Sequence, residues 1–459
     1  APALLRDCAF VGRWHDYNNG PIARRRGVNI VDISDPATPA IVGEVPATTN
    51  PGGVARELRT VDLPNFKMLV VMIFSGSLAD RTNNKIHTYT FPSGDCTQPV
   101  HAGTFDMRTF RGHEFFLWVD PDPAHNVAGH ARALIFITAP TGPPNIMVVD
   151  VSDPASPALI GLYDAGQPVV SPSEAAGTYL GNYAHSISLS DDGTEAYISY
   201  WDGGYFTMDT TAFTLGAPAG AFAPKGAMSA PFRYPLGEAG NTHSAVRIPG
   251  TDTVVVGDEI YISTDGCPFG WMRTVDIGDA ATPPRQVGEF RLAENRSENC
   301  VDVPIGPPDA TGTRPVMRAA NVRNADGALI DGTFSMHNQT VLPGFALASW
   351  YGAGLRVIDV RDPRAPAEVG SFVPRPLDVT TSIPSTSAPT YGRTAGVEDD
   401  WWVATWSYPI VRDGLIYVTD VRNGLYILRP SSTAPFKPAV DDAGFSEGNS
   451  NLGAVRRRS

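Results

Sequence analysis

The sequence predicts an all-β fold, a single seven-bladed β-propeller of four-stranded blades around a central channel, and three observations indicate it. Among 459 residues, 45 glycines and 41 prolines fall between short apolar runs, as many short strands joined by tight turns require. Long amphipathic helical patterns are almost absent. Similar segments recur roughly every 60 to 80 residues, a period that holds four strands and their loops.

The repeated unit is an apolar strand ending in aspartate, then an Asp-Pro turn, then a second strand that carries a glycine. Residues 27–45 read GVNIVDISDPATPAIVGEV, and residues 145–163 read NIMVVDVSDPASPALIGLY. The other copies, three of them weaker, complete a set of seven and lie at 85–105, 204–213, 271–290, 354–372 and 424–430.

Aspartates of the repeat are expected to be structural. A carboxylate at the start of the turn can cap it, while the following proline presets φ and prevents further strand pairing. These capping aspartates are Asp35, Asp153 and Asp362. A second set ends the preceding strand and is expected to bond local backbone amides: Asp32, Asp150, Asp276 and Asp359.

The propeller is expected to occupy residues 1–431 and to be followed by a C-terminal tail, 432–459. Insertions longer than hairpins require are expected near 164–182, 214–240 and 291–333. The first blade is expected to lack its inner strand, since the chain opens directly at CAFVGRW (8–14). Pairing of the two termini in one sheet would then close the ring.

Charge and hydropathy exclude two classes of partner. The net charge is −13, and no basic stripe is present apart from Arg456–Arg458, so we expect no nucleic acid. No apolar run reaches the roughly 18 residues that a transmembrane helix needs. The chain begins Ala1-Pro2-Ala3, as mature chains often do after signal cleavage, although a cloning boundary would look the same.

Four cysteines are widely spaced, and none belongs to a Cys-x-x-Cys pair, which disfavours a thiolate zinc site. We expect disulfides Cys267–Cys300 and Cys8–Cys96, since each pair would lie within one blade or between neighbouring blades. Disulfides place the protein in an oxidising compartment, either secreted, at the cell surface or periplasmic. The alternative is a cytosolic protein with four buried thiols.

The signature GLxVIDVxDPxxP and inner strands that begin with His-Asn or His-Ser resemble the LVIVD-repeat proteins, which are bacterial extracellular propellers that often carry variable surface anchors. The resemblance covers roughly residues 10–430. It implies the propeller fold and an extracellular location. It implies little about function, because propellers host enzymes, receptors and scaffolds alike.

Four of the nine histidines occupy one equivalent position, at the start of the first strand of a blade: His113, His185, His243 and His337. Because innermost strands line a propeller's channel, these side chains are expected at one level around the axis, with Arg56 of the second blade nearby. Strand alternation is expected to turn the next residues away from the channel; these are Glu114, Ser186, Ser244 and Asn338.

Three interpretations of the histidines remain open. They can form a structural network between blades. They can hold copper, iron or zinc, which imidazole suits. They can also line a metal-free pocket, where Arg56 would favour an anionic ligand.

Other polar and aromatic residues carry weaker signals. Glu259, in VVVGDEIY, offers a carboxylate but is expected to be solvated. Turn aspartates at 120, 122, 191 and 192 have oxygen ligands that suit structural calcium, although ordinary turn chemistry explains them equally. Aromatic residues next to the repeat, such as Trp201 and Tyr351, are expected to pack mainly between blades.

The first functional hypothesis is a secreted or surface-displayed binding and scaffolding module with a polar, histidine-lined channel mouth. Its ligand would be a protein, a glycan or a small molecule. The alternative is a metal-dependent enzyme, an oxidoreductase for example, that uses the four histidines. No Gly-x-Ser-x-Gly, His-Glu-x-x-His or Walker sequence is present, which disfavours common hydrolases and nucleotide-dependent enzymes.

Overall fold

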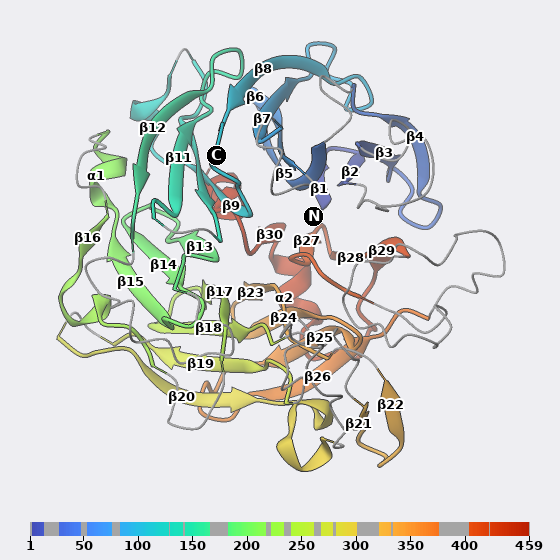
Figure 1. The fold of residues 1–459 in the computed structure, drawn as a ribbon. Coiled ribbons are helices and arrows are strands. Elements are labelled where there is room, and N and C mark those ends of the chain that lie inside the picture. The colour runs from blue at the N-terminus through green and yellow to red at the C-terminus, as the bar shows by residue number, and fades with distance from the viewer. Residues whose placement is uncertain are drawn as a thin grey trace, which may run out of the picture.

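Seven four-stranded antiparallel sheets follow one another around a central channel in the computed structural model of the protein (Figure 1), which confirms the predicted propeller. The structure describes residues 2–12, 27–46, 53–75, 83–127, 129–140, 143–165, 182–216, 222–233, 240–260, 268–278, 281–300, 321–331, 334–375, 404–421 and 423–458.

In the first six blades the strands run outward from the channel in chain order. Blades 1 to 3 contain β1 (Pro2–Leu5), β2 (Cys8–Gly12), β3 (Val28–Asp32), β4 (Ala40–Glu44), β5 (Gly53–Leu63), β6 (Phe66–Ser75), β7 (Lys85–Thr90), β8 (Val100–Asp106), β9 (Glu114–Val119), β10 (Ala133–Thr138), β11 (Ile146–Asp150) and β12 (Ala158–Tyr163). Blades 4 to 6 contain β13 (Ser186–Leu189), β14 (Glu195–Ser199), β15 (Tyr205–Asp209), β16 (Ala223–Pro224), β17 (Thr242–Arg247), β18 (Thr253–Asp258), β19 (Met272–Asp276), β20 (Arg285–Phe290), β23 (Gln339–Leu342), β24 (Phe345–Trp350), β25 (Gly354–Asp359) and β26 (Ala367–Phe372).

Blade 7 is assembled differently, in the order β30, β27, β28, β29. Its strands are β27 (Ile410–Arg412), β28 (Leu415–Asp420), β29 (Gly424–Leu428) and β30 (Phe445–Glu447). The remaining elements are short: η2 (Pro123–His125), α1 (Thr211–Thr214), η3 (Gly226–Ser229), η4 (Ala293–Asn295), η5 (Ser297–Asn299), the hairpin β21 (Asn321–Arg323) and β22 (Leu329–Asp331), α2 (Lys437–Asp442) and α3 (Leu452–Arg458). No helix in the described part of the chain has the length and apolar character to cross a membrane.

Burial decreases from the channel outward. In blade 3, β9 and β10 are buried at every position because, apart from Glu114 and Thr138 at one end, they are continuous apolar runs, EFFLWV and ALIFIT, and pack between neighbouring blades. The outer strand β12 is exposed or half-buried throughout. The core therefore lies between blades, along their inner halves.

The repeat aspartates satisfy backbone amides locally, as expected. Asp32 accepts the N–H of Ser34 at 2.9 Å, and Asp35 accepts the N–H of Ala37 at 3.0 Å. The same bonds recur at the other copies, Asp150, Asp153, Asp276, Asp359 and Asp362. The rim turns are therefore self-contained.

The Asp-Pro turn also latches one blade to the previous one. The hydroxyl of Thr88 in blade 2 donates to the carbonyl of Pro154 in blade 3 at 2.5 Å, and Thr274 in blade 5 donates to Pro363 in blade 6 at 2.5 Å. Each threonine pairs with the repeat glycine of its own outer strand, where a Cβ would collide with that same carbonyl. Close approach of the next blade thus explains why a glycine recurs there.

The segment expected as a tail instead completes the ring from inside. β30 pairs with β27 on its channel side, and the chain then runs beside β9 of blade 3 (Figure 1). The side-chain amide of Asn451 donates to the carbonyls of Val119 and Asp191, on blades 3 and 4, at 2.8 and 2.9 Å. The amide of Gly448 donates to the hydroxyl of Thr340 on blade 6 at 2.9 Å. The expectation of a separate tail fails because these contacts join residues far apart in sequence.

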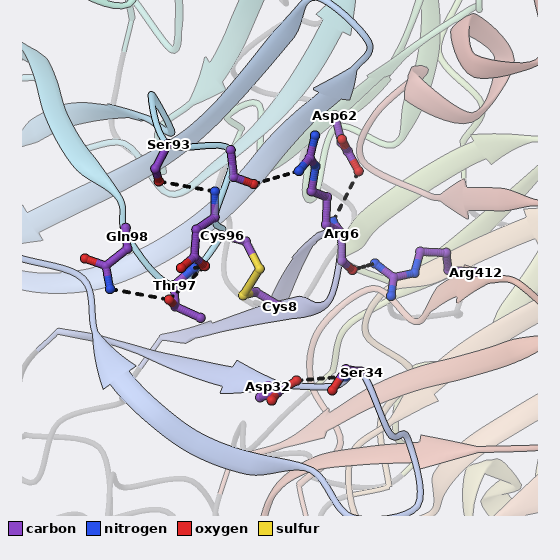
Figure 2. The surroundings of a disulfide bond; sticks show 12 residues. Arg6, Cys8, Asp32, Ser34, Asp62, Ser93, Cys96, Thr97, Gln98 and Arg412 are labelled. Atoms are coloured by element: carbon purple, nitrogen blue, oxygen red, sulfur yellow. Dashed lines mark hydrogen bonds between the residues drawn. A yellow bond between two sulfur atoms is a disulfide. The ribbon is translucent and has the colours of Figure 1, made fainter.

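The amino terminus also differs from expectation, because β1 supplies the inner strand of blade 1 and the two termini pair in different sheets. Figure 2 shows Arg6 at the junction of blades 7, 1 and 2: its carbonyl accepts from Arg412 at 2.6 Å, and its guanidinium donates to the carbonyl of Gly94 at 2.6 Å. Side-chain and backbone bonds therefore close the ring at this junction, in place of a shared sheet.

A disulfide joins Cys8 and Cys96, whose Cα atoms are 5.9 Å apart, and so links blade 1 to the turn after β7 in blade 2 (Figure 2). This is the pairing that the sequence analysis expected. Cys300 is also disulfide-bonded, and its expected partner Cys267 lies outside the described residues. Most of the expected insertions lie outside them too; the described parts form β16, η3, η4, η5 and the β21–β22 hairpin.

Candidate functional site

The four predicted histidines lie side by side at one end of the inner strands, in blades 3, 4, 5 and 6. Ring centroids of neighbours are 4.5 Å apart for His113 and His185, 4.2 Å for His185 and His243, and 4.1 Å for His243 and His337. The structure thus brings the four imidazoles together as a continuous arc. Three of the four rings are buried, and His113 at one end is half-buried.

The residues that follow the histidines were expected to turn away from the channel, and this was wrong for three of them. The amide of Asn338 in blade 6 donates to Glu114 in blade 3 at 3.4 Å, and Ser186 in blade 4 is bonded to Tyr408 in blade 7 at 3.2 Å. Both contacts cross the channel. Alternation fails because three histidines precede the first paired residue of their strand, and the fourth is the extra residue of a bulge in β17. Ser244 bonds instead to the neighbouring blade, through the carbonyl of His337.

Glu259 was expected to be solvated, but it is buried beside three of the four histidines. Its carboxylate oxygens lie 3.4 Å from His243 Nε2, 3.5 Å from His337 Nε2 and 4.0 Å from His185 Nε2. It also accepts a hydrogen bond from the hydroxyl of Tyr351. A second carboxylate, that of Glu114, lies 3.8 Å from His243 Nε2. His243 therefore lies beside two carboxylates and between two imidazoles.

Burial keeps these groups neutral in the absence of a cation. It lowers the pKa of His243 to about 3, and it lowers the pKa of the other three arc histidines well below the ordinary value. Burial likewise raises the pKa of Glu114 and of Glu259 to about 8. Neutral imidazoles keep the lone pairs that coordinate metals, and a bound cation would offset the cost of ionising the carboxyl groups.

Several polar atoms of this buried cluster make no hydrogen bond of normal geometry. They are both ring nitrogens of His243, Nδ1 of His185 and Oε2 of Glu114, although the backbone of His337 lies close enough to His243 to favour its protonation. Buried polar atoms without partners are rare in folded proteins, and each requires an explanation such as an ion or a ligand. The backbone of the next blade lies near the rings of His185 and His243, as the Trp406 carbonyl lies near His337, but Nε2 of His243 and Oε2 of Glu114 still make no hydrogen bond.

The donor atoms have the spacing of a metal coordination sphere. With bonds of about 2.0–2.1 Å, tetrahedral ligands lie about 3.4 Å from one another, close to the separations between Glu259 and the histidines. Three overlapping triads in the described residues have all their donor atoms within 4.8 Å: His185–His243–Glu259, Glu114–His243–His337 and His113–Glu114–His185. Two histidines with one carboxylate suit zinc or non-haem iron. The arc is therefore not a single four-histidine centre.

His113 differs from the other three because Arg56 is directed at it. The guanidinium of Arg56 lies 3.0 Å from His113 Nε2 and 3.3 Å from Nδ1, and it donates to the His113 carbonyl at 3.2 Å. A ring nitrogen that accepts from a guanidinium has no lone pair left for a metal. The structure therefore places Arg56 against His113, where the guanidinium competes with a metal for the ring nitrogens of that residue.

An axial ion network lies below the histidines and connects them to the C-terminal segment. Arg59, fully buried, pairs with Glu57 at 2.5 Å and with Glu447 of β30 at 2.9 Å. Asn449 donates to Glu57 at 2.8 Å, while Glu57 accepts the N–H of Phe115, next to Glu114, at 2.7 Å. Because of these bonds, the C-terminal segment fixes the floor of the candidate site.

Sequence reasoning left out Arg59, assigned no role to Glu57, expected Tyr351 only to pack between blades, and misjudged Glu259. Comparison of the second strands would have found two of them, since Glu259 and Tyr351 stand at the same place in blades 5 and 6 as Trp201 in blade 4. The turns considered for calcium are satisfied locally: Asp120 pairs with His125 at 2.9 Å and Asp192 accepts from Ser190 at 2.7 Å. No described triad of potential ligands includes them.

One comparison with known proteins matches the repeats, and none assigns a function. The LVIVD repeat family model matches residues 22–47 and 144–165. A search of curated proteins finds no match.

Among solved structures, the chain is similar to Sqt1 from Chaetomium thermophilum, with 13% identity over 95% of this chain and 85% of that one and a TM-score of 0.44. It is similar to a periplasmic gluconolactonase from Pseudomonas aeruginosa, with 15% identity, 79% and 96% coverage and a TM-score of 0.43. A hypothetical selenium-binding protein from Sulfolobus tokodaii gives 13% identity, 92% and 83% coverage and a TM-score of 0.48. Likenesses this distant carry no argument about activity. Together, the ring of blades and the two matched segments show a seven-bladed β-propeller that contains LVIVD repeats.

Proposed function

We propose that this propeller is a metal-binding module whose centre is coordinated by His185, His243 and Glu259, with His337 and Glu114 adjoining. One observation carries the proposal: the Nε2 atoms of three imidazoles surround one buried carboxylate at 3.4–4.0 Å. These separations are too long for good hydrogen bonds and suit ligands that share an ion. The mixed nitrogen and oxygen donors favour iron or zinc, with copper as the third candidate.

The metal would supply Lewis acidity or electron transfer, and the chain's residues would hold it. Two histidines and one carboxylate leave coordination positions free for water or a substrate, as in catalytic rather than structural sites. The binding-module hypothesis and the metal-dependent enzyme hypothesis therefore use the same site. The metal content of the purified protein distinguishes both hypotheses from a purely structural role of the histidines.

Elemental analysis of the full chain, purified without a polyhistidine tag, tests this proposal. We expect close to one equivalent of iron, zinc or copper per chain. His243→Gln should remove it, while His130→Gln, which alters a half-buried histidine stacked on Phe66 away from the arc, should not. Wild-type protein that binds none of the three metals, even after incubation with each, would overturn the proposal.

Arg56 favours a second candidate function, a metal-free pocket for a small anionic ligand. Its guanidinium is on the rim of the arc, and guanidinium groups bind carboxylates and phosphates through paired hydrogen bonds. Arg56→Gln would then abolish binding of a small dicarboxylate such as succinate, measured by calorimetry in the presence of a chelator. If succinate binds only in the absence of chelator, the metal centre is the function instead.

We further propose that the protein works in an oxidising compartment, secreted, at the cell surface or in the periplasm. The Cys8–Cys96 bridge and the bonded state of Cys300 support this location, because disulfides rarely persist in the cytosol. Peptide mapping without reduction, on protein from its native source, should recover both bridges. Recovery of four free thiols would contradict the location.

A further inference from the structure

One position of the second strand supplies a side chain to the histidine arc in three consecutive blades. The N–H of His185 donates to the carbonyl of Ser199, and that of His337 donates to the carbonyl of Ser349. In blade 5 the equivalent residue is Gly257, which pairs with the neighbour of His243. Two residues after these three come Trp201, Tyr351 and Glu259 respectively, and all three are buried. Glu259 is a proposed ligand, so its two aromatic counterparts are candidates for supporting roles.

Trp201 and Tyr351 share a backbone conformation that bulky residues rarely adopt, with φ of 45° and 21°. Their surroundings hold this conformation in the same way. The carbonyl of Trp201 accepts from Gly204 and from Thr242 of the next blade, both at 3.1 Å. The carbonyl of Tyr351 accepts from Gly354 at 3.2 Å and from Thr405 of the next blade at 3.1 Å. Strain that a structure maintains through several bonds is typical of functional sites.

The side chains of Trp201 and Tyr351 each contact a candidate metal ligand. Trp201 stacks on His185, with centroids 4.7 Å apart and planes inclined by 23°. Tyr351 lies 5.3 Å from His337 at its edge, and its hydroxyl donates to Glu259. The Nδ1 atom of His337 bonds the carbonyl of Trp406 at 2.6 Å, which leaves Nε2 facing Glu259. The aromatic pair therefore brackets the arc at His185 and at His337.

We propose that Trp201 and Tyr351 are positioning residues of the metal centre: Trp201 fixes the ring plane of His185, and Tyr351 orients the carboxylate of Glu259. This inference rests on the proposed metal function. Packing between blades, the role expected from sequence, needs large apolar rings but not left-handed backbone. Outer-shell partners that orient ligands typically change metal affinity by about 10–100-fold when removed.

Cobalt(II) titration of the full chain, followed by visible absorption, separates positioning from packing. The variants are Tyr351→Phe, which removes only the hydroxyl, and Trp201→Phe on another blade. Tyr205→Phe is the matched control, because Tyr205 is equally buried and its hydroxyl bonds Thr207 at 2.7 Å, a contact outside the arc. We expect about 10-fold or greater loss of cobalt affinity and shifted d–d bands for the first two variants, and neither change for the control.

The outcomes distinguish this inference from the function on which it rests. Wild-type protein that binds neither cobalt nor any of iron, zinc and copper would overturn both. Cobalt bound by Tyr351→Phe and Trp201→Phe with wild-type affinity and spectrum would overturn the positioning roles and leave the metal centre standing. If one variant does not fold, the other, on a different blade, decides the question alone.

Discussion

Polar groups are hydrogen-bonded in different ways at the channel axis and in the outer hairpins. At the rim each repeated aspartate bonds an amide two residues ahead, and the turn is complete without help from elsewhere. At the axis the polar groups come from different blades, are buried, and include ring nitrogens and a carboxylate oxygen without hydrogen bonds. Polar groups of the outer turns find their partners within the same hairpin. Polar groups at the channel axis meet their partners only in the assembled ring.

This difference separates two causes of recurrence in a repeat sequence. Asp35, Asp153 and Asp362 recur because the same turn is built three times. His185, His243 and His337 recur in equivalent places and share one partner, the Glu259 carboxylate, which blade 5 alone supplies. Recurrence alone therefore does not distinguish structural from functional residues; the state of their hydrogen bonds does.

The largest effect on stability is expected at the axis, from Arg59→Met. This change leaves the carboxylates of Glu57 and Glu447 buried without their cation and should cost up to about 5 kcal/mol of unfolding free energy. Urea denaturation measures it. Adding Glu447→Leu should recover part of the loss, because one uncompensated charge is then removed. A loss below about 1 kcal/mol for Arg59→Met would show that the axial network does not hold the ring.

A smaller loss is expected from removing the bridge between blades 1 and 2. The Cys8–Cys96 bridge closes a long loop, with a sequence separation of 88 residues, and its removal by Cys8→Ser with Cys96→Ser should lower stability by about 4 kcal/mol. Chemical denaturation measures the loss for the variant, and reduced wild type should lose at least as much, because reduction also breaks the bridge of Cys300. If both equal the oxidised protein, contacts such as Arg6–Gly94 already fix this junction without the disulfide.

A histidine in the outer half of a blade offers a pH test away from the arc. Burial lowers the pKa of His87 to about 4, so the unfolded chain binds a proton more readily than the folded one between pH 6.5 and 4. Stability should fall by about 3 kcal/mol as pH decreases through that window, and His87→Gln should lack this component. Urea denaturation at pH 7 and pH 4.5 measures the difference, with His130→Gln as control. Identical pH slopes for wild type and His87→Gln would refute the assignment.

The smallest effect is expected for the rim latch. Thr274→Val removes the hydrogen bond to the carbonyl of Pro363 and should cost about 1 kcal/mol. Thr88→Val should cost the same through Pro154, and the double variant should show the sum, since the two latches lie in different blades. Thermal denaturation suffices. Unchanged melting temperatures in both single variants would mean that the Asp-Pro turn acts only within its own hairpin.

The fold could be predicted from sequence because its determinants are local. Turn chemistry at Asp-Pro, apolar strand runs and the repeat period all act within one blade. The convergence of the four histidines was also predictable, since equivalent positions on inner strands face one axis. The disulfide between Cys8 and Cys96 followed from the same blade count.

What the sequence did not reveal arises between distant segments. Residues 432–459 looked like a tail because β30 is short and its partners belong to other blades. Glu259 looked solvated because its neighbours in sequence give no sign that three imidazoles surround it. Strict alternation misplaced Glu114 and Asn338, since the inner strands begin irregularly at the histidines. Each error concerns a contact that exists only after the ring closes.

The central claim is that His243 and Glu259 share a metal ion, and anomalous diffraction tests it most directly. Crystals of the full chain grown with zinc would be measured above and below the zinc absorption edge. We predict one strong anomalous peak about 2.0–2.2 Å from His243 Nε2 and from a Glu259 oxygen, with His185 as the third ligand. No peak at the arc, or zinc found only at rim carboxylates such as Asp122, would contradict the account.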